Sequence, residues 1–473
     1  MFEIQNINEV CEFLDNTFKK SCDLSKRYIK SSNLPVFIYS FSNYCDKKYI
    51  AEELIRPLSE NKEPVENQNQ FLSLLFPVKF SELYTKDDLV RSVLDGNAAI
   101  ICYIENAVYA FGTEAKSNNG RSVSEPNTDI VVRGPREGFV ESAETNIALI
   151  RKKIKNPSLC VEKTVCGQNT GTEVFIVYLE GIAKEESIAK VKSRLLQMSL
   201  SSCLDSGYIE PYLYDKKYPV FPEAGTSEKP DKVAAKILGG RIAIFCDGSP
   251  AVITIPYFFI ESLQSAEDYL KSPYFATFSR IIRFTAMFFS LFLPGIYLAL
   301  IEHHTSAIPY KLYMTIAASR ENIPFSLATE LLGVLLMFEI IREVGIRMPK
   351  VVGDAVSIVA SIIIGDAAIE AGIASAPVII IAALSATCSF INPPFMNSVP
   401  LIRIIILVFA RLFGIFGVIV CLTFIICALA GKTSLGRPYL LPITPMIPGG
   451  ISDTLIMLPK KALKHSENEI DTE

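Results

Sequence analysis

Three hydrophobic patterns follow one another along the chain. Residues 1 to about 60 place apolar positions at helical spacing, with polar breaks. Short β-type runs rich in Ile, Val and Tyr begin with AAIICYI (98–104) and ENAVYAF (105–111), separated by Gly, Asn and Glu turns. Long uncharged runs begin at residue 284. The order predicts a helical start, an α/β middle and an α-helical membrane part.

The middle of the chain alternates strand-like and helix-like segments, which indicates mixed α/β architecture. The motif G-x-x-A-I-x-C-x4-A-V occurs at 96–108 and again at 240–252, and it is typical of one β-hairpin used in two related units. Further strands are expected at 128–133, 159–166, 172–180, 241–247 and 251–258, and helices at 139–155 and 184–200.

Charge separates the soluble part from the membrane part. Residues 1–283 carry 34 Lys and Arg and 37 Asp and Glu, whereas residues 284–431 carry 7 and 8. We therefore expect an α/β cytoplasmic region of two related subdomains, followed by an α-helical multi-pass membrane domain. The expected divisions are a helical N-terminal extension (1–66), α/β subdomain 1 (67–158), α/β subdomain 2 (159–277), a transmembrane domain with four to six membrane segments (278–431) and a C-terminal tail (432–473).

Three uncharged runs are long enough to cross a membrane: 284–301, 373–391 and 412–431. The last run is expected to continue a single helix that begins near residue 401. Pro294 and Gly295 lie near the middle of the first run, so a kink is expected there that a neighbouring helix must cover.

Two further runs, 327–345 and 351–372, are long enough to cross but contain acids. An ionisable group in mid-membrane costs at least about 2.5 kcal/mol, so these helices should face protein or water. Glu330 and Glu339 of the first run are nine positions apart and so lie on opposite faces of the helix. Asp366 and Glu370 of the second run are four positions apart and so share one face. The candidate pore or intramembrane polar residues are Glu330, Glu339, Asp354, Asp366 and Glu370.

Membrane topology has two solutions. With a cytoplasmic N-terminus, the basic loop after residue 342 lies inside, as the positive-inside rule requires, but five spans leave the basic tail outside. Either one acid-containing segment does not cross, or the run 401–431 is not a single helix.

Composition excludes several other functions. Net charge is −4 and acids mix with bases, so a nucleic-acid interface is not expected. The acidic N-terminus has no apolar core of a signal peptide. Eleven cysteines without a CxxC pair indicate free buried thiols. Glu302, His303 and His304 are adjacent and point in different directions, so neither a metal nor a cofactor is implied, and without a catalytic motif an enzyme is not expected.

The polar stretch VRGPREGFVESAETN (132–146) precedes the helix expected at 139–155. Gly134 and Gly138 permit a turn, and the acids suit the positive end of a helix. A structured turn or an interface salt-bridge cluster is favoured over a small-anion site at the helix start, because three glutamates would repel the anion. The candidate subunit-interface residues are Arg133, Arg136, Glu137 and Glu141.

Several motifs in order resemble the A subunits of spore germination receptors, the GerA family. The first is VRGPREGFVESAETNIALIRKKIKNPSL (132–159), and the resemblance extends from about residue 70 to residue 448. Arg437 departs from the family's usual Gly-Val-Pro-Tyr tail motif. The further motifs are IPYKLYMTIAASRENIPFS (308–326), the stretch 330–349 ending REVGIRMP, IIIGDAAIEAGIASAP (362–377) and SLGRPYLLPITP (434–445).

The resemblance implies a subunit in the inner membrane of a bacterial spore, with its N-terminal domain in the cytoplasm. It implies a homo-oligomer that conducts monovalent cations and assembles with a transporter-like B subunit and a lipoprotein C subunit. The related stage V sporulation AF type, a secondary transporter and a non-conducting scaffold are the alternatives. The germinant, the ion and the subunit number stay open.

Overall fold

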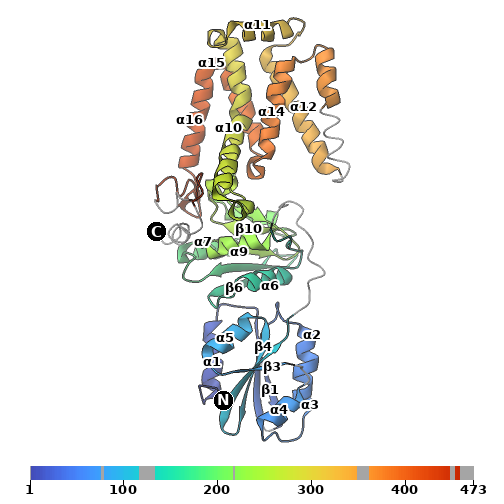
Figure 1. The fold of residues 1–473 in the computed structure, drawn as a ribbon, viewed down its shortest axis with the longest axis vertical. Coiled ribbons are helices and arrows are strands. Elements are labelled where there is room, and N and C mark those ends of the chain that lie inside the picture. The colour runs from blue at the N-terminus through green and yellow to red at the C-terminus, as the bar shows by residue number, and fades with distance from the viewer. Residues whose placement is uncertain are drawn as a thin grey trace. The chain divides into compact units, whose positions relative to one another are not determined.

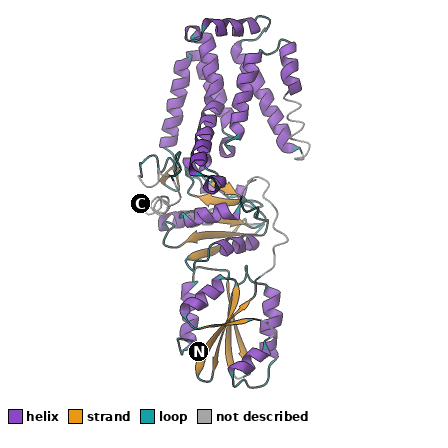
Figure 2. Cartoon of the chain, in the orientation of Figure 1, coloured by secondary structure: helices purple, strands orange, loops and turns teal. Residues whose placement is uncertain are grey.

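The structure is a computed structural model that describes residues 2–32, 34–75, 79–116, 134–216, 219–348, 362–447 and 453–458. These residues form two compact units. One, the α/β unit, lies within Met1–Tyr218 and Ala224–Tyr257, and the other, the helical unit, comprises Pro219–Glu223 and the chain from Phe258 onward (Figures 1 and 2).

The first half of the α/β unit is a five-stranded antiparallel sheet with helices on both faces (Figure 1). Alternate residues of its strands pack on opposite faces: Ile38 and Ile100 lie in one core cluster, and Tyr39 and Ile101 in the other. The elements are α1 (Ile7–Thr17), β1 (Leu24–Ser31), β2 (Leu34–Phe41), α2 (Lys47–Tyr49), the π-helical turn η1 (Ile50–Ile55), α3 (Arg56–Glu60), α4 (Gln68–Leu74), β3 (Phe80–Leu83), α5 (Lys86–Leu94), β4 (Asn97–Ile104) and β5 (Ala107–Glu114).

The second half repeats this topology. Its strand order, β6-β7-β9-β10-β8, matches β1-β2-β4-β5-β3 strand for strand. The core on one face joins the sheet to α6 and α9 through apolar residues such as Ile147 and Ile237. The elements are α6 (Ala143–Lys153), β6 (Leu159–Cys166), β7 (Thr172–Leu179), α7 (Glu185–Leu196), the 3-10 turn η3 (Ser206–Tyr208), α8 (Glu210–Leu213), β8 (Gly225–Ser227), α9 (Pro230–Leu238), β9 (Ile242–Cys246) and β10 (Val252–Ile255).

The repeated hairpin motif is confirmed. Its two copies form β4–β5 and β9–β10, each after a helix that ends just before a glycine with positive φ, Gly96 (+80°) or Gly240 (+82°). The alanine, isoleucine and cysteine that the motif fixes on the first strand are buried in both copies. The two α/β halves are therefore related units, as the sequence predicted.

The prediction of a separate helical extension over residues 1–66 is wrong, because part of this segment forms strands of the first sheet. Residues 24–41 are β1 and β2, and β2 pairs with β4 in the centre of the first sheet. The strand Leu34–Phe41 is apolar at nearly every position because it is buried on both faces, so it lacks the alternation that identifies a half-buried strand. The first α/β half therefore begins near the N-terminus and not at residue 67.

The helical unit consists mainly of helices that lie side by side with their axes roughly aligned (Figure 1). Only α10 among the described residues is both long and apolar enough to cross a membrane by itself. Residues 362–370 are also helical. The other elements are the 3-10 turns η4 (Phe259–Leu263) and η5 (Ala266–Leu270), α10 (Pro273–His303), η6 (Thr305–Ala307), α11 (Tyr310–Ser319), α12 (Leu327–Arg347), α14 (Ala376–Phe390), η7 (Pro393–Phe395), α15 (Val399–Phe413), α16 (Ile415–Ala430), β11 (Thr433–Ser434) and β12 (Arg437–Pro438).

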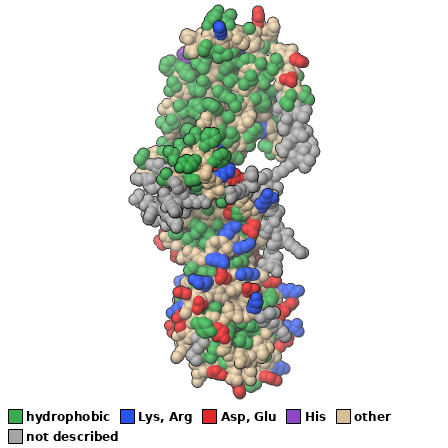
Figure 3. Space-filling view, in the orientation of Figure 1, with side chains coloured by type: hydrophobic (Ala, Val, Ile, Leu, Met, Phe, Trp, Pro, Cys, Tyr) green, Lys and Arg blue, Asp and Glu red, His purple; other side chains and the backbone are tan. Residues whose placement is uncertain are grey.

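The run 401–431 is two helices and not a single one, which is one of the two alternatives that the topology argument left open. α15 ends and α16 begins at Gly414, whose φ of +60° and ψ of −140° are open mainly to glycine. The two helices pack closely, since a Cβ on Gly417 would lie 2.1 Å from the carbonyl oxygen of Phe409. The helical surface seen in Figure 3 is mostly hydrophobic, whereas charged side chains gather over the α/β unit.

Candidate functional site

The polar stretch before α6 is a turn anchored to the second α/β half. The helix begins at Ala143, four residues later than expected, because Ser142 caps it by accepting a hydrogen bond from Thr145 N. The buried side chain of Asn146 both donates to and accepts from the backbone of Val140, at 2.6 and 2.8 Å. Ala143 N donates to the Asp247 carboxylate at 3.0 Å. These hydrogen bonds fix the conformation of the polar stretch as a structured turn before α6.

The four interface candidates differ in their surroundings. Glu137 pairs with Lys152 and Lys153 of α6, at 3.0 and 3.3 Å, and the hydrogen bond from Lys152 lowers the pKa of Glu137 below its ordinary value. Arg136 and Glu141 are exposed on the α/β unit. Arg133 lies outside the described residues. Glu137 is therefore paired within its own chain, whereas the side chains of Arg136 and Glu141 are exposed.

A buried ion pair joins the two α/β halves, and sequence reasoning missed it. Arg151 of α6 donates through Nε and Nη2 to both oxygens of Asp23, at 2.5 and 2.7 Å, and through Nη2 to Ser21 Oγ at 3.2 Å. Its guanidinium carbon lies 3.8 Å from the centre of the Phe41 ring. A signal was available, because Arg151 follows Ile147 by four positions and so shares the apolar face of the helix.

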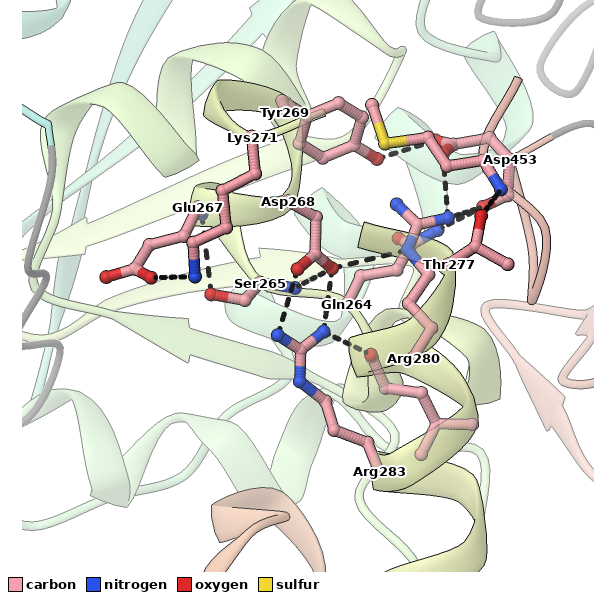
Figure 4. A network of polar contacts seen from close by, with 12 residues as sticks. Gln264, Ser265, Glu267, Asp268, Tyr269, Lys271, Thr277, Arg280, Arg283 and Asp453 are labelled. Atoms are coloured by element: carbon pink, nitrogen blue, oxygen red, sulfur yellow. Dashed lines mark hydrogen bonds and ion pairs between the residues drawn. The ribbon is translucent and has the colours of Figure 1, made fainter. Parts of the chain in front are cut away.

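A second buried cluster lies at the start of α10 (Figure 4). Asp268 of η5 accepts two hydrogen bonds from Arg283, at 2.7 and 2.9 Å, and one from Arg280 at 3.2 Å. Arg280 Nη1 also donates to Asp453 Oδ1 and to the backbone oxygens of Asp453 and Thr454, at 2.7 to 2.9 Å. The cluster therefore ties α10 to the segment that precedes it and to the C-terminal segment 453–458.

The charges of this cluster balance only when the C-terminal segment is in place. Asp268 and Arg280 have no exposed side-chain surface, and Asp453 supplies the second negative charge opposite Arg280 and Arg283. Burial is the largest single influence and would raise the pKa of Asp268, but the hydrogen bonds from Arg283 and the Ser265 backbone and the charges of Arg283 and Arg280 together outweigh it and hold the pKa below the ordinary 3.8. Asp268 therefore stays ionised at neutral pH.

Of the candidate acids in the helical unit, Glu330 is fully paired. Its buried carboxylate accepts hydrogen bonds from the backbone N and the Oγ of Ser375 at 2.7 and 2.6 Å, and from Arg320 Nε at 3.1 Å. Ser375 precedes the first residue of α14, so the carboxylate also meets the positive end of that helix. Glu330 thus joins α12 to α14.

Glu339 lies between two arginines. Its carboxylate is 2.7 Å from Arg342 on the same helix and 3.6 Å from Nη1 of Arg403 on α15. Arg403 is 2% exposed, and sequence reasoning did not single it out. It also donates through Nε to the carbonyl oxygen of Ser290 on α10, at 2.9 Å. An arginine inside the apolar run after residue 399 was the available signal.

Asp366 and Glu370 have a different environment. Both are exposed on the helical segment 362–370, whereas Gly365 and Ala368 of the same segment are buried, so the two acids share one face as expected. Asp354 lies outside the described residues. Within the described part of the chain, no cluster of three or more His, Cys, Asp or Glu side chains is arranged to hold a metal ion.

Comparison with known proteins identifies the family. Residues 12–468 match the model of the Bacillus/Clostridium GerA spore germination proteins. The chain is 38% identical to spore germination protein KA of Bacillus subtilis (strain 168), over 93% of this chain and 82% of that protein. It is 34% identical to spore germination protein A1 of the same organism, over 94% and 92%. The chain therefore belongs to the GerA family, and the resemblance read from its motifs is confirmed.

One solved structure is also similar. It is the crystal structure of the N-terminal domain of the A subunit of the Bacillus megaterium spore germinant receptor GerK3. The match has 26% sequence identity and a TM-score of 0.39, and it covers 53% of this chain and 94% of that one.

Proposed function

We propose that this chain is the membrane-embedded A subunit of a spore germinant receptor, and that copies of it together form a pathway for monovalent cations. The supporting observation is the exposed acidic face of 362–370. Asp366 and Glu370 share this segment with Ile362 and Ile363, whose side chains are 59% and 60% exposed. An acid that faces lipid costs at least about 2.5 kcal/mol, so this face needs water or another subunit. A carboxylate-lined passage favours cations.

Helix count supports a multi-pass topology. Six segments are candidates to cross: α10, α12, 362–370, α14, α15 and α16. An even number of crossings returns the basic tail to the side of the N-terminal domain, as the positive-inside rule requires. Exposed apolar side chains on the last two helices, such as Leu412 and Phe424 at 63% and 71%, suit contact with lipid. We place the α/β unit in the cytoplasm and the helices in the spore inner membrane.

The test of the cation pathway is charge removal on the exposed acidic face. Asp366→Asn and Glu370→Gln, singly and together, are introduced into spores that depend on this receptor, and cation release is followed after germinant is added. Release is expected to slow in each single variant and most in the double. Glu321→Gln, at an exposed acid outside the helices, is the matched control. Normal release from the double variant would exclude these acids from the pathway.

Assembly is proposed to use the cytoplasmic turn and two partner subunits. Arg136 and Glu141 on neighbouring copies would form a salt-bridged seam, and the transporter-like B subunit and the lipoprotein C subunit would complete the receptor. Charge reversal of Arg136 or Glu141 should weaken the purified oligomer, and reversal of both should restore it in part. If neither single reversal changes the mass of the complex, the seam lies elsewhere. Co-purification from spore membranes tests the partners.

A further inference from the structure

The middle of α10 contains a carbonyl that its own helix cannot satisfy. Pro294 lies inside the helix and has no N–H to donate to the carbonyl of Ser290, four residues earlier. That carbonyl instead accepts two hydrogen bonds from neighbouring helices, from Arg403 Nε of α15 at 2.9 Å and from Ser385 Oγ of α14 at 3.0 Å. Ser290 and Ser385 are buried, so no water replaces these donors.

Close packing brings Arg403 within reach. Gly295 follows the proline, and a Cβ at this position would lie 2.6 Å from the Cγ2 atom of Ile406 on α15. Only a glycine allows the two helices to approach this closely without displacing Ile406. Pro294 and Gly295 thus act together: one removes a hydrogen-bond donor from α10, and the other admits the helix that supplies a replacement.

The guanidinium of Arg403 also needs a counter-charge, because a buried and unpaired cation is costly. Glu339 of α12 provides it at 3.6 Å, and the Ser385 carbonyl accepts a further hydrogen bond from Arg403 Nη2 at 3.4 Å. One side chain on α15 therefore contacts α10, α12 and α14, and it does so at the point where α10 lacks its own hydrogen bond.

We infer that Arg403 is a positioning residue that takes the place of the missing Pro294 N–H and fixes the middle of α10 relative to α12. Glu339 then acts as the counter-ion of Arg403. It affects cation release by holding Arg403 in place, and not by binding cations itself. The inference rests on the proposed function in one respect alone, namely that a displaced α10 changes cation release.

A rescue experiment tests the inference, with the full-length chain in detergent and in spores. Arg403→Met removes the donor and is expected to increase the rate of proteolytic cleavage about tenfold, as loss of a buried hydrogen-bond partner predicts. Pro294→Ala restores an N–H to the Ser290 carbonyl. The double variant Pro294→Ala/Arg403→Met should therefore be cleaved more slowly than Arg403→Met alone. Recovery is expected to be incomplete, because Glu339 keeps Arg342 but still lacks Arg403, the second of its two arginine partners.

The control is Arg411→Met on the same helix, where the arginine is half-exposed and pairs with Glu302. Pro294→Ala should not protect this variant. Additive effects of Pro294→Ala and Arg403→Met, or wild-type resistance of Arg403→Met, would overturn the inference. The cleavage readout does not involve ions, so rescue without any cation conductance would leave the role of Arg403 standing and count against the proposed pathway instead.

Discussion

The ion pair between Arg151 and Asp23 gives the sharpest prediction for the α/β unit. The change is Arg151→Met, which keeps the length of the side chain and removes its charge. Both partners are buried, with side-chain exposures of 2% and 0%. The variant leaves a carboxylate in the core without its two hydrogen bonds from the guanidinium, in a place that water does not reach.

Breaking a buried pair by removing one partner costs about 3–5 kcal/mol, which is a factor of about 10² to 4 × 10³ in the unfolding equilibrium. The free energy of unfolding is measured in urea on residues 1–257 produced as a fragment, with circular dichroism as the probe. The double variant Asp23→Asn/Arg151→Met removes both charges, so it should lose less stability than Arg151→Met does.

A matched control is available at the same junction. Lys20 and Glu180 also join the two halves, but their side chains are 48% and 51% exposed. Lys20→Met should leave the unfolding curve almost unchanged, because exposed pairs contribute little. If Arg151→Met shifts the unfolding free energy by less than about 1 kcal/mol, the pair is solvated in solution and the reasoning from burial fails.

Three further predictions concern other parts of the molecule. Asp268 has a folded pKa below its ordinary 3.8, so its contribution to stability is fully present above about pH 4 and is lost as the pH falls through the folded pKa. Asp268→Asn should therefore lower the melting temperature in detergent at pH 7, and this difference from the wild type should shrink as the pH is lowered below 3.8. Maleimide should label the exposed Cys22 of the folded chain, whereas the nine buried thiols should react only after denaturation; native labelling of these buried thiols as fast as that of Cys22 would contradict the packing. Gly417→Ala should reduce the yield of folded protein from membranes, because its Cβ would meet the backbone of α15, whereas Gly333→Ala, with open space around it, should not.

The sequence predicted most of the α/β region because its strands are short and bounded by turns. The hairpin motif identified two related units, and the sheet order confirms them. β1 was missed because it is an edge strand whose exposed positions are polar, as in Lys26, Arg27 and Tyr28, so its apolar residues show no period of two. β1 forms a strand because it pairs with β2 along its whole length, and its own sequence pattern does not predict this pairing.

The buried charges were harder to predict. The exposed acids Asp366 and Glu370 were singled out because they interrupt an apolar run, a signal that also marked the buried Glu330. Arg151 was missed among the basic residues of RKKIK (151–155), although its spacing of four from Ile147 places it on the apolar face of α6. The break at Gly414 was missed because neither a proline nor a charge marks it, and only the φ of +60° shows that the glycine is required.

The cluster around Arg280 also has a consequence for how the protein is made. Its partner Asp453 lies 173 residues further along the chain. A ribosome therefore completes every helix of the unit before the acid that neutralises this arginine exists. Until then Arg280, near the start of α10, lacks its hydrogen bonds to Asp453 and Thr454. Closure of the cluster can accordingly occur only after translation of the last helix, so a chain truncated before residue 453 should remain unfinished and be a substrate for membrane proteases.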